Sequence, residues 1–189
     1  TFLARSRRNG DHRGVGEQRG NQVVPGMVER GWGRIIFATS EIARGTQKNP
    51  LGATVLGGGI AMMRDLATTH FGSGVTFNCY APSAATRTYE MYMEQVEAGL
   101  MAGKDREQLL ALPRLAGPEH IAPMITWLCS DAGASVSGEV FSLAGGSISQ
   151  WTKAQDGVRL IKAGPGGPEL WTLEELSEQL PKCLVPSGV

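Results

Sequence analysis

Three short runs of apolar residues constrain the fold of this chain more than any other feature. They are RIIFATS at 34–40, GVTFNCYAP at 74–82 and GEVFSLAGG at 138–146. The first run, RIIFATS, is apolar without alternation, which is typical of parallel strands that are covered on both faces. Helical patterns separate the runs. We therefore predict an α/β fold, a truncated doubly wound (Rossmann-like) parallel sheet with helices on both faces.

Helices are predicted from apolar spacing and from capping residues. The two main ones cover about 54–71 and 117–131, and Pro118 suits the first turn of the second. The remaining predictions are the end of a helix in 23–33, stopped by Gly31 and Gly33, and short amphipathic helices at 89–103 and 105–112.

The two ends of the chain differ in character from its middle. Residues 1–22 are rich in Arg and Gly and poor in apolar residues, so we predict a disordered arm. The alternatives for this segment are a basic arm that contacts phosphate, or a stretch that is foreign to the fold. Residues 23–150 form the predicted partial domain, and 151–189 a C-terminal extension. In that extension Thr172 and Glu175 form a capping box for a helix that Pro181 stops.

Composition excludes several function classes. The chain has 18 basic and 18 acidic residues, so it has no net positive charge that would favour binding to nucleic acid or to an anionic membrane. No apolar run approaches the roughly 20 residues that span a bilayer. Its three cysteines are far apart and form no CxxC pair, which favours a reducing, cytoplasmic compartment and no metal site. Because the sequence starts at Thr1, we expect a processed, truncated or incompletely described product.

Several motifs occur in a recognisable order. ERGWGRIIFATS, GVTFNCYAPSAATR and GPEHIAPMITWLCSDAGASVSGEVFSLAGG together resemble the second half of the short-chain dehydrogenase/reductase family, over about 23–150. The tail LWTLEELSEQL is similar to the extension of acyl-CoA or steroid-type members. The resemblance implies a nicotinamide oxidoreductase. In that family a Gly-rich turn holds the cofactor pyrophosphate, and a Ser polarises the substrate oxygen. A Tyr transfers the proton, and a Lys one helical turn beyond lowers the pKa of that Tyr.

The resemblance matches Ser40 to the family serine, but the proton donor is missing. Counting forward without gaps places the Tyr and Lys at Ala53 and Gly57. Counting backward from later motifs places them at Gly52 and Leu56. Both registers lack the pair, so we interpret Ser40 as vestigial.

The cofactor motifs are also reduced. No TGxxxGxG precedes a helix in this sequence. Pro82 and Thr86 match the loop after the second strand, where Thr86 is similar to the residue that binds the carboxamide, and we interpret both as vestigial. We expect no cofactor to bind tightly.

Other candidate residues give weaker signals. TVLGGGIAMM could act as a phosphate loop through Gly57, Gly58 and Gly59, or could simply let a helix pack closely. Tyr89 and Tyr92 are candidates for a replacement acid, with core or lid packing as the alternative. The three histidines are scattered, at positions 12, 70 and 120.

Two functional hypotheses follow. The first is a degenerate, non-catalytic subunit or scaffold that forms a homo-oligomer, or a hetero-oligomer with an intact member of the family. The exposed edge of a half-sheet and the helices at 54–71 and 117–131 would be covered by that partner. The second is an enzyme that uses Ser40 and a lid tyrosine. It would be either an NAD(P)-dependent oxidoreductase, with NAD or NADP as cofactor, or a non-redox enzyme acting on a keto, acyl-CoA or steroid-like substrate.

Overall fold

The computed structural model describes residues 2–5, 17–45, 49–99, 107, 110, 114–154 and 159–183. The chain divides into two compact units, Thr1–Trp151 and Thr152–Val189. Among the described residues, no helix is both long enough and apolar enough to cross a membrane.

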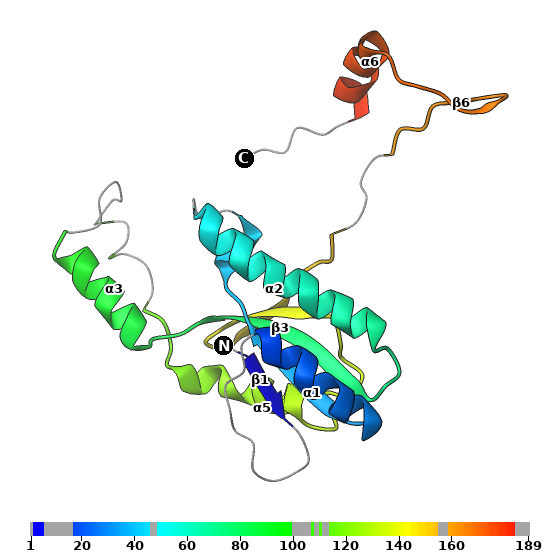
Figure 1. Ribbon diagram of the computed structural model, residues 1–189. Helices are drawn as coiled ribbons and strands as arrows, with labels where there is room; N and C mark the ends of the chain where they lie inside the picture. The colour runs from blue at the N-terminus through cyan, green and yellow to red at the C-terminus, as the bar shows by residue number, and fades with distance from the viewer. Residues whose placement is uncertain are drawn as a thin grey trace. The chain divides into compact units, whose positions relative to one another are not determined.

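The N-terminal unit is built on one five-stranded sheet in the order β1-β2-β3-β4-β5 (Figure 1). The central strands β2, β3 and β4 are parallel, and the edge strands β1 and β5 are antiparallel to their neighbours. The bounds are β1 Phe2–Arg5, β2 Gly33–Ala38, β3 Val75–Ser83, β4 Val140–Ala144 and β5 Ser147–Gln150. The three parallel strands are those predicted from the apolar runs, which confirms the fold class.

Helices cover both faces of this sheet, as predicted. Helices α1 (Glu17–Glu29) and α2 (Pro50–Thr69) pack on one face, and α5 (Ala122–Cys129) packs on the other (Figure 1). Neighbouring strand residues point to opposite sides, because side chains alternate along a strand. Ile35 therefore joins the core under α1 and α2, whereas Ile36 joins the core under α5. This two-sided burial explains the continuous apolar run Ile35–Phe37 in β2.

Helix boundaries differ from the predicted ones where proline intervenes. Helix α2 begins four residues before the predicted 54, because Pro50 fits a first turn and Asn49 Oδ1 accepts a hydrogen bond from Gly52 N at 2.9 Å. The predicted helix at 117–131 is divided into the 3₁₀ turn η2 (Pro118–His120) and α5, since Pro123 restricts the residue before it.

The other predicted helices are only partly described. The expected helix end in 23–33 is α1, which stops before Gly31, a residue with φ 63°. Helix α3 (Arg87–Glu97) covers the first part of the predicted 89–103. Apart from residues 107 and 110, the predicted helix at 105–112 lies outside the described residues.

Regular structure begins earlier than the sequence indicated. Strand β1 pairs with β2, with Phe2 opposite Phe37 and Arg5 opposite Arg34. Helix α1 starts at Glu17. Strand β1 and the first six residues of α1 fall within residues 1–22, for which we expected a disordered arm. Backbone pairing to the edge of β2 supplies order that the composition of the segment did not suggest.

The C-terminal unit contains a short hairpin and one helix. Strands β6 (Ala163–Gly164) and β7 (Gly167–Pro168) pair antiparallel, and α6 covers Leu173–Cys183. The predicted capping box is present: Glu175 N donates to Thr172 Oγ1 at 3.2 Å, and Thr172 N donates to Glu175 Oε2 at 2.9 Å. The expectation that Pro181 ends the helix was wrong, because α6 continues to Cys183. A proline near a helix end removes only one backbone donor.

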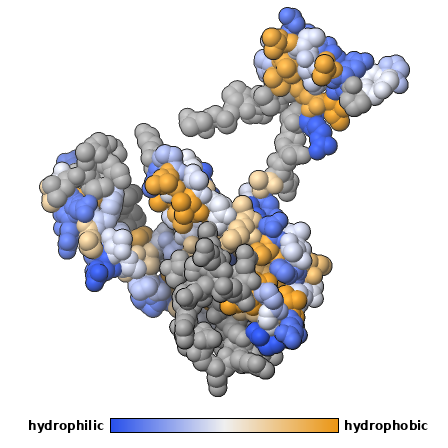
Figure 2. Space-filling view, in the orientation of Figure 1, coloured by the Kyte–Doolittle hydropathy of each residue, from blue (hydrophilic) through white to orange (hydrophobic). Residues whose placement is uncertain are grey.

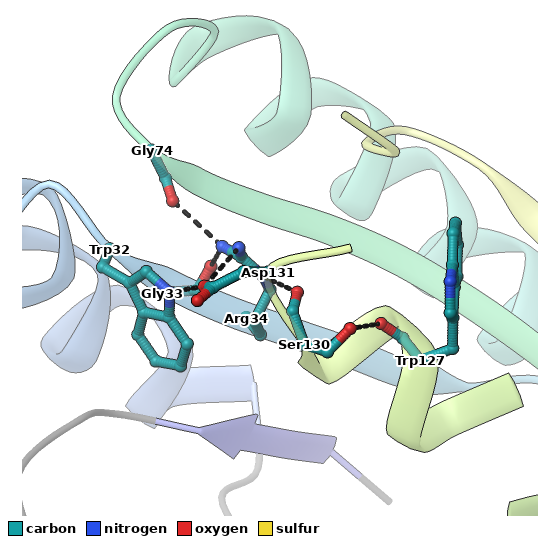
Figure 3. A network of polar contacts seen from close by, with 7 residues as sticks. All are labelled: Trp32, Gly33, Arg34, Gly74, Trp127, Ser130 and Asp131. Atoms are coloured by element: carbon teal, nitrogen blue, oxygen red, sulfur yellow. Dashed lines mark hydrogen bonds and ion pairs between the residues drawn. The ribbon is translucent and has the colours of Figure 1, made fainter. Parts of the chain in front are cut away.

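A buried arginine holds the amino ends of the central strands. Arg34 is only 2% exposed, and its guanidinium donates hydrogen bonds to three backbone carbonyls (Figure 3). These are the carbonyls of Gly33 at 2.9 Å, Gly74 at 3.1 Å and Ser130 at 3.3 Å. One side chain thus joins the starts of β2 and β3 to the end of α5. A planar, permanently charged group suits this role because its fixed donors can each meet a carbonyl.

Two residues complete the surroundings of this guanidinium. The Asp131 carboxylate lies 3.9 Å from Arg34 Nη2 and is 74% exposed. Trp32 donates to Asp131 Oδ1 at 3.1 Å, and Arg34 Cζ lies 4.9 Å from the Trp32 ring centroid. Because Asp131 is open to solvent, its attraction contributes less than the buried carbonyl bonds.

The turn before β3 requires a glycine. Gly74 has φ 79°, and an added Cβ would overlap the carbonyl oxygen of Gly31. Gly72 has a similar φ of 78°, but a Cβ there would meet nothing within 4 Å. A comparison of substitutions at Gly72 and Gly74 therefore separates the free-energy cost of the left-handed backbone from the cost of a steric overlap.

We predict that Arg34→Met lowers the free energy of unfolding by about 2–4 kcal/mol, because buried carbonyls would lose their donors. Asp131→Asn should cost less than about 1 kcal/mol, since the carboxylate is solvated. Urea unfolding followed by circular dichroism measures both. Equal losses would mean that the exposed ion pair, not the buried carbonyl bonds, holds the strands.

We also predict that Gly72→Ala costs about 1–2 kcal/mol through its left-handed backbone. Gly74→Ala should cost at least about 2 kcal/mol more, because the backbone at Gly31 must shift. The same unfolding measurement applies. Indistinguishable midpoints for the two variants would contradict the close approach.

Candidate functional site

The carboxyl ends of the three parallel strands meet at one edge of the sheet. This carboxyl edge consists of residues 39–45 after β2, 82–86 at the end of β3, and 144–146 after β4. Thr39 N donates to Tyr80 O at 2.8 Å, and Ala85 N donates to Ala116 O at 2.8 Å, so the edge is a connected surface. Ligands of parallel α/β sheets bind at such an edge.

Ser40 begins the short 3₁₀ helix η1 (Glu41–Arg44). Its backbone is extended, with φ −153° and ψ 160°, and its Oγ accepts a hydrogen bond from Ile42 N at 3.3 Å. Gly45 ends η1 with φ 76°. Ser40 is thus a capping residue, and this bond leaves the hydroxyl proton able to point elsewhere.

Helix α2 packs along η1 and presents its first turns to the Ser40 turn. Thr39 Oγ1 donates to Leu56 O at 3.4 Å, and a Cβ on Gly57 would lie 3.8 Å from Ala43 O. From Pro50 to Met63, no residue of α2 has an ionisable side chain. Both registers considered for the family tyrosine and lysine fall inside this stretch.

The two registers for the family tyrosine and lysine differ in how much space the structure leaves for an added side chain. A Cβ on Gly52 would lie 2.9 Å from Asn49 Nδ2, so a larger residue there would disturb the cap of α2. Gly57 has only the ordinary contact with Ala43 O. A Cβ at position 57 therefore fits without disturbing the cap of α2.

Gly57, Gly58 and Gly59 do not form a phosphate loop. All three lie in the interior of α2, where each amide already donates to a carbonyl of the preceding turn. A Cβ on Gly59 would come 3.6 Å from the Phe37 ring, which fits the alternative of close helix packing.

Pro82 and Thr86 lie at the carboxyl edge and are both exposed. Pro82 is part of β3 and stands opposite Leu143 of β4. Thr86 is the N-cap residue of α3, although its side chain makes no capping bond. Both positions are open to a ligand, but they supply no charge.

The lid tyrosines lie on α3, where Tyr89 and Tyr92 are partly buried. Tyr89 shares a side-chain hydrogen bond with Arg114, which also donates to Glu97 at 3.1 Å. Ser40 and Tyr89 therefore have separate hydrogen-bond partners. Tyr80 lies on β3, and burial raises its pKa. A raised pKa is unfavourable for an acid–base group that must act near neutral pH.

The remaining reactive side chains are structural. Burial raises the pKa of the Cys79 thiol to about 12, so it is not a nucleophile. His70 stacks on Phe77 with ring centroids 5.7 Å apart, and His120 is exposed. His12 lies outside the described residues. Within the described parts of the chain, no three His, Cys, Asp or Glu residues gather as a metal site would need.

Two features of the structure had no signal in the sequence. One is a cluster that we call the Trp151 cluster: Glu41, Arg44, Ser142 and Trp151. Glu41 and Arg44 lie about a hundred positions before Ser142 and Trp151, so no local sequence pattern reveals the cluster. The other is a cleft of about 750 Å³ between α5 and β5, lined by Trp127, Phe141 and Ile148 among others.

Known proteins resemble this chain in sequence. The model of a family described as Enoyl-(Acyl carrier protein) reductase matches residues 20–147. Acetoacetyl-CoA reductase of Cupriavidus necator is 32% identical over 134 residues, which cover 66% of this chain and 49% of that protein. Dehydrogenase/reductase SDR family member 4 of Bos taurus is 31% identical over 132 residues, covering 67% and 45%.

Solved structures agree on the fold. A short chain dehydrogenase from Mycobacterium avium superposes with a TM-score of 0.60 at 22% identity, covering 88% of this chain and 49% of that one. L-sorbose reductase from Gluconobacter frateurii, complexed with NADPH and L-sorbose, gives 0.55 at 25% identity, covering 67% and 51%.

The chain spans about half the length of the curated relatives that it matches. The family match covers most of its residues and includes the parallel strands and the carboxyl edge. The chain therefore belongs to the short-chain dehydrogenase/reductase family.

Proposed function

We propose that this chain is a non-catalytic member of its family, a subunit or scaffold without standard redox activity. One observation carries the proposal: the turns of α2 beside Ser40 contain no ionisable side chain between Pro50 and Met63. Reduction of a carbonyl needs a proton at oxygen when hydride reaches carbon, so a poised acid is required.

In the proposal, none of Ser40, Tyr80 and Tyr89 replaces that acid, and the carboxylate of Glu41 is already bound by Arg44 and Ser142. Ser40 is a weak acid and a weak nucleophile unless a base accompanies it. Tyr80 has a raised pKa, and Tyr89 bonds to Arg114. In this proposal Ser40 can hold a substrate oxygen, but none of these groups is poised to move its proton.

The proposal extends to the cofactor. The described residues offer no glycine-rich turn at a helix start. Gly57–Gly59 lie inside α2, whereas Gly145–Gly146 and Gly166–Gly167 lie where β4 turns into β5 and β6 into β7. Pro82 and Thr86 could touch a nicotinamide but cannot hold a pyrophosphate, which is bound by backbone amides and cationic side chains. We therefore derive no catalytic step through NAD or NADP for these residues.

The names of the relatives favour the alternative. Those named above are reductases or dehydrogenases, and the L-sorbose reductase was solved with NADPH. In that reading this chain is an NAD(P)-dependent oxidoreductase in which Ser40 orients the substrate and Tyr89 or Tyr92 supplies the proton. A non-redox reaction on a keto, acyl-CoA or steroid-like substrate would use the same residues.

We predict that Ala53→Tyr combined with Gly57→Lys gives no dehydrogenase activity, because positioning of a bound cofactor supplies much of the rate. The assay follows NADPH and NADH absorbance with keto-acyl and steroid ketones. Parent and Gly57→Lys alone are the matched controls. Turnover by the double variant alone would reveal a cofactor site, and turnover by the parent would favour the alternative.

We further propose that α2 is covered by a partner, either a second copy or an intact family member. Leu51 and Val55 are 76% and 61% exposed, one turn apart on α2. Figure 2 shows hydrophobic residues gathered at this end of the helix. Exposed apolar side chains that share a helix face are typical of an interface.

We predict that the parent chain self-associates and that Leu51→Glu with Val55→Glu makes it monomeric, since burying two carboxylates is costly. Sedimentation velocity measures this. Thr69→Glu, an exposed change at the other end of α2, is the control. If the parent is monomeric both alone and with an intact family member, or if the double variant still associates, this face is not the interface.

A further inference from the structure

The Trp151 cluster joins three parts of the N-terminal unit that are distant in sequence. Ser142 of β4 is its centre: Trp151 Nε1 donates to Ser142 Oγ at 2.6 Å, and Arg44 Nη2 approaches it at 3.4 Å. Ser142 in turn donates to the Glu41 carboxylate. One hydroxyl therefore connects both ends of η1 to the indole.

Arg44 closes the cluster on the solvent side. Its Nε lies 2.6 Å from Glu41 Oε2, and its Cζ lies 4.1 Å from the centroid of the Trp151 ring. A guanidinium over an indole face gains cation–π attraction in addition to the ion pair. Arg44 is about half exposed, so water can reach these contacts.

Trp151 lies where the chain leaves the N-terminal unit, so its contacts link that exit point to η1. Trp151 is the last residue of the N-terminal unit, and its backbone N donates to Val140 O at 2.8 Å. Its side chain holds η1, the turn that Ser40 caps. The chain therefore leaves the N-terminal unit through a residue whose indole is hydrogen-bonded to Ser142 and stacked by Arg44 of η1.

We propose that Trp151 is a latch that holds the Ser40 turn in place against β4. With the indole seated, η1 is fixed between α2 and Ser142. When the indole leaves, Ser142 loses its closest donor and Arg44 loses its stacking surface, so η1 opens while the sheet stays folded. A binding event that draws residue 152 onward away from β4 would thereby loosen Ser40. This device does not depend on whether the chain is catalytic.

The test is amide hydrogen exchange by NMR on the full chain. The amides of Ala43 and Gly45, which bond to Ser40 O at 2.9 Å and Ile42 O at 3.0 Å, report on η1. The amide of Cys79, bonded to Glu139 O at 2.8 Å, reports on the sheet. Local opening and global unfolding are thus read separately.

We expect Trp151→Ala and Ser142→Ala each to speed exchange at Ala43 and Gly45 roughly tenfold, with Cys79 unchanged. Trp151→Phe keeps a ring for Arg44 but loses the Nε1 donor, so it should give a smaller effect. Trp127→Phe, on an exposed tryptophan outside the cluster, is the control and should change neither reporter.

Unchanged exchange at Ala43 and Gly45 in Ser142→Ala would overturn the latch. Exchange that rises equally at Cys79 would also overturn it, because Trp151 would then be a general packing residue. If Trp151→Ala does not fold, Trp151→Phe decides, since it removes only the Nε1 donor to Ser142 and leaves the bonds of Ser142 to η1 in place.

Discussion

The buried guanidinium of Arg34 fixes the geometry on which the rest of the N-terminal unit depends. By bonding the carbonyls of Gly33 and Gly74 it aligns the starts of β2 and β3, and by bonding Ser130 it ties α5 to them. Parallel strands that start in register also end in register. The carboxyl edge, with Ser40 after one strand and Pro82 on the next, therefore has its shape set at the opposite end of the sheet.

The same edge explains why this family member is proposed to lack catalysis. The serine turn, helix α2 beside it and the loop from β3 to α3 lie together at this edge. The α2 surface that faces Ser40 presents only small and apolar residues from Pro50 to Met63. A fold fixes positions, whereas function depends on the side chains that occupy them. Residues such as Gly59 now serve close packing against Phe37.

The sequence predicted the parts of the fold whose cause is local. The segments around Ile35, Phe77 and Val140 identified the three parallel strands, because helical patterns separate them along the chain. Strand β5, SISQ, is fully exposed and therefore carries no apolar signal. Strand β1 was missed because its order comes from pairing with β2, which no composition of residues 1–22 reveals. The contacts of Arg34 and Trp151 join residues far apart in the chain, so only the folded structure brings them together.

The central claim is that these residues do not hold a nicotinamide cofactor. Isothermal titration of NADPH and NADH into the purified chain tests it most directly, because binding is measured without any assumption about substrate. The account predicts no saturable heat up to about 1 mM cofactor, a concentration that would saturate any site with a Kd in the micromolar range. A Kd in the micromolar range for either cofactor would contradict it and would favour an oxidoreductase that uses Ser40.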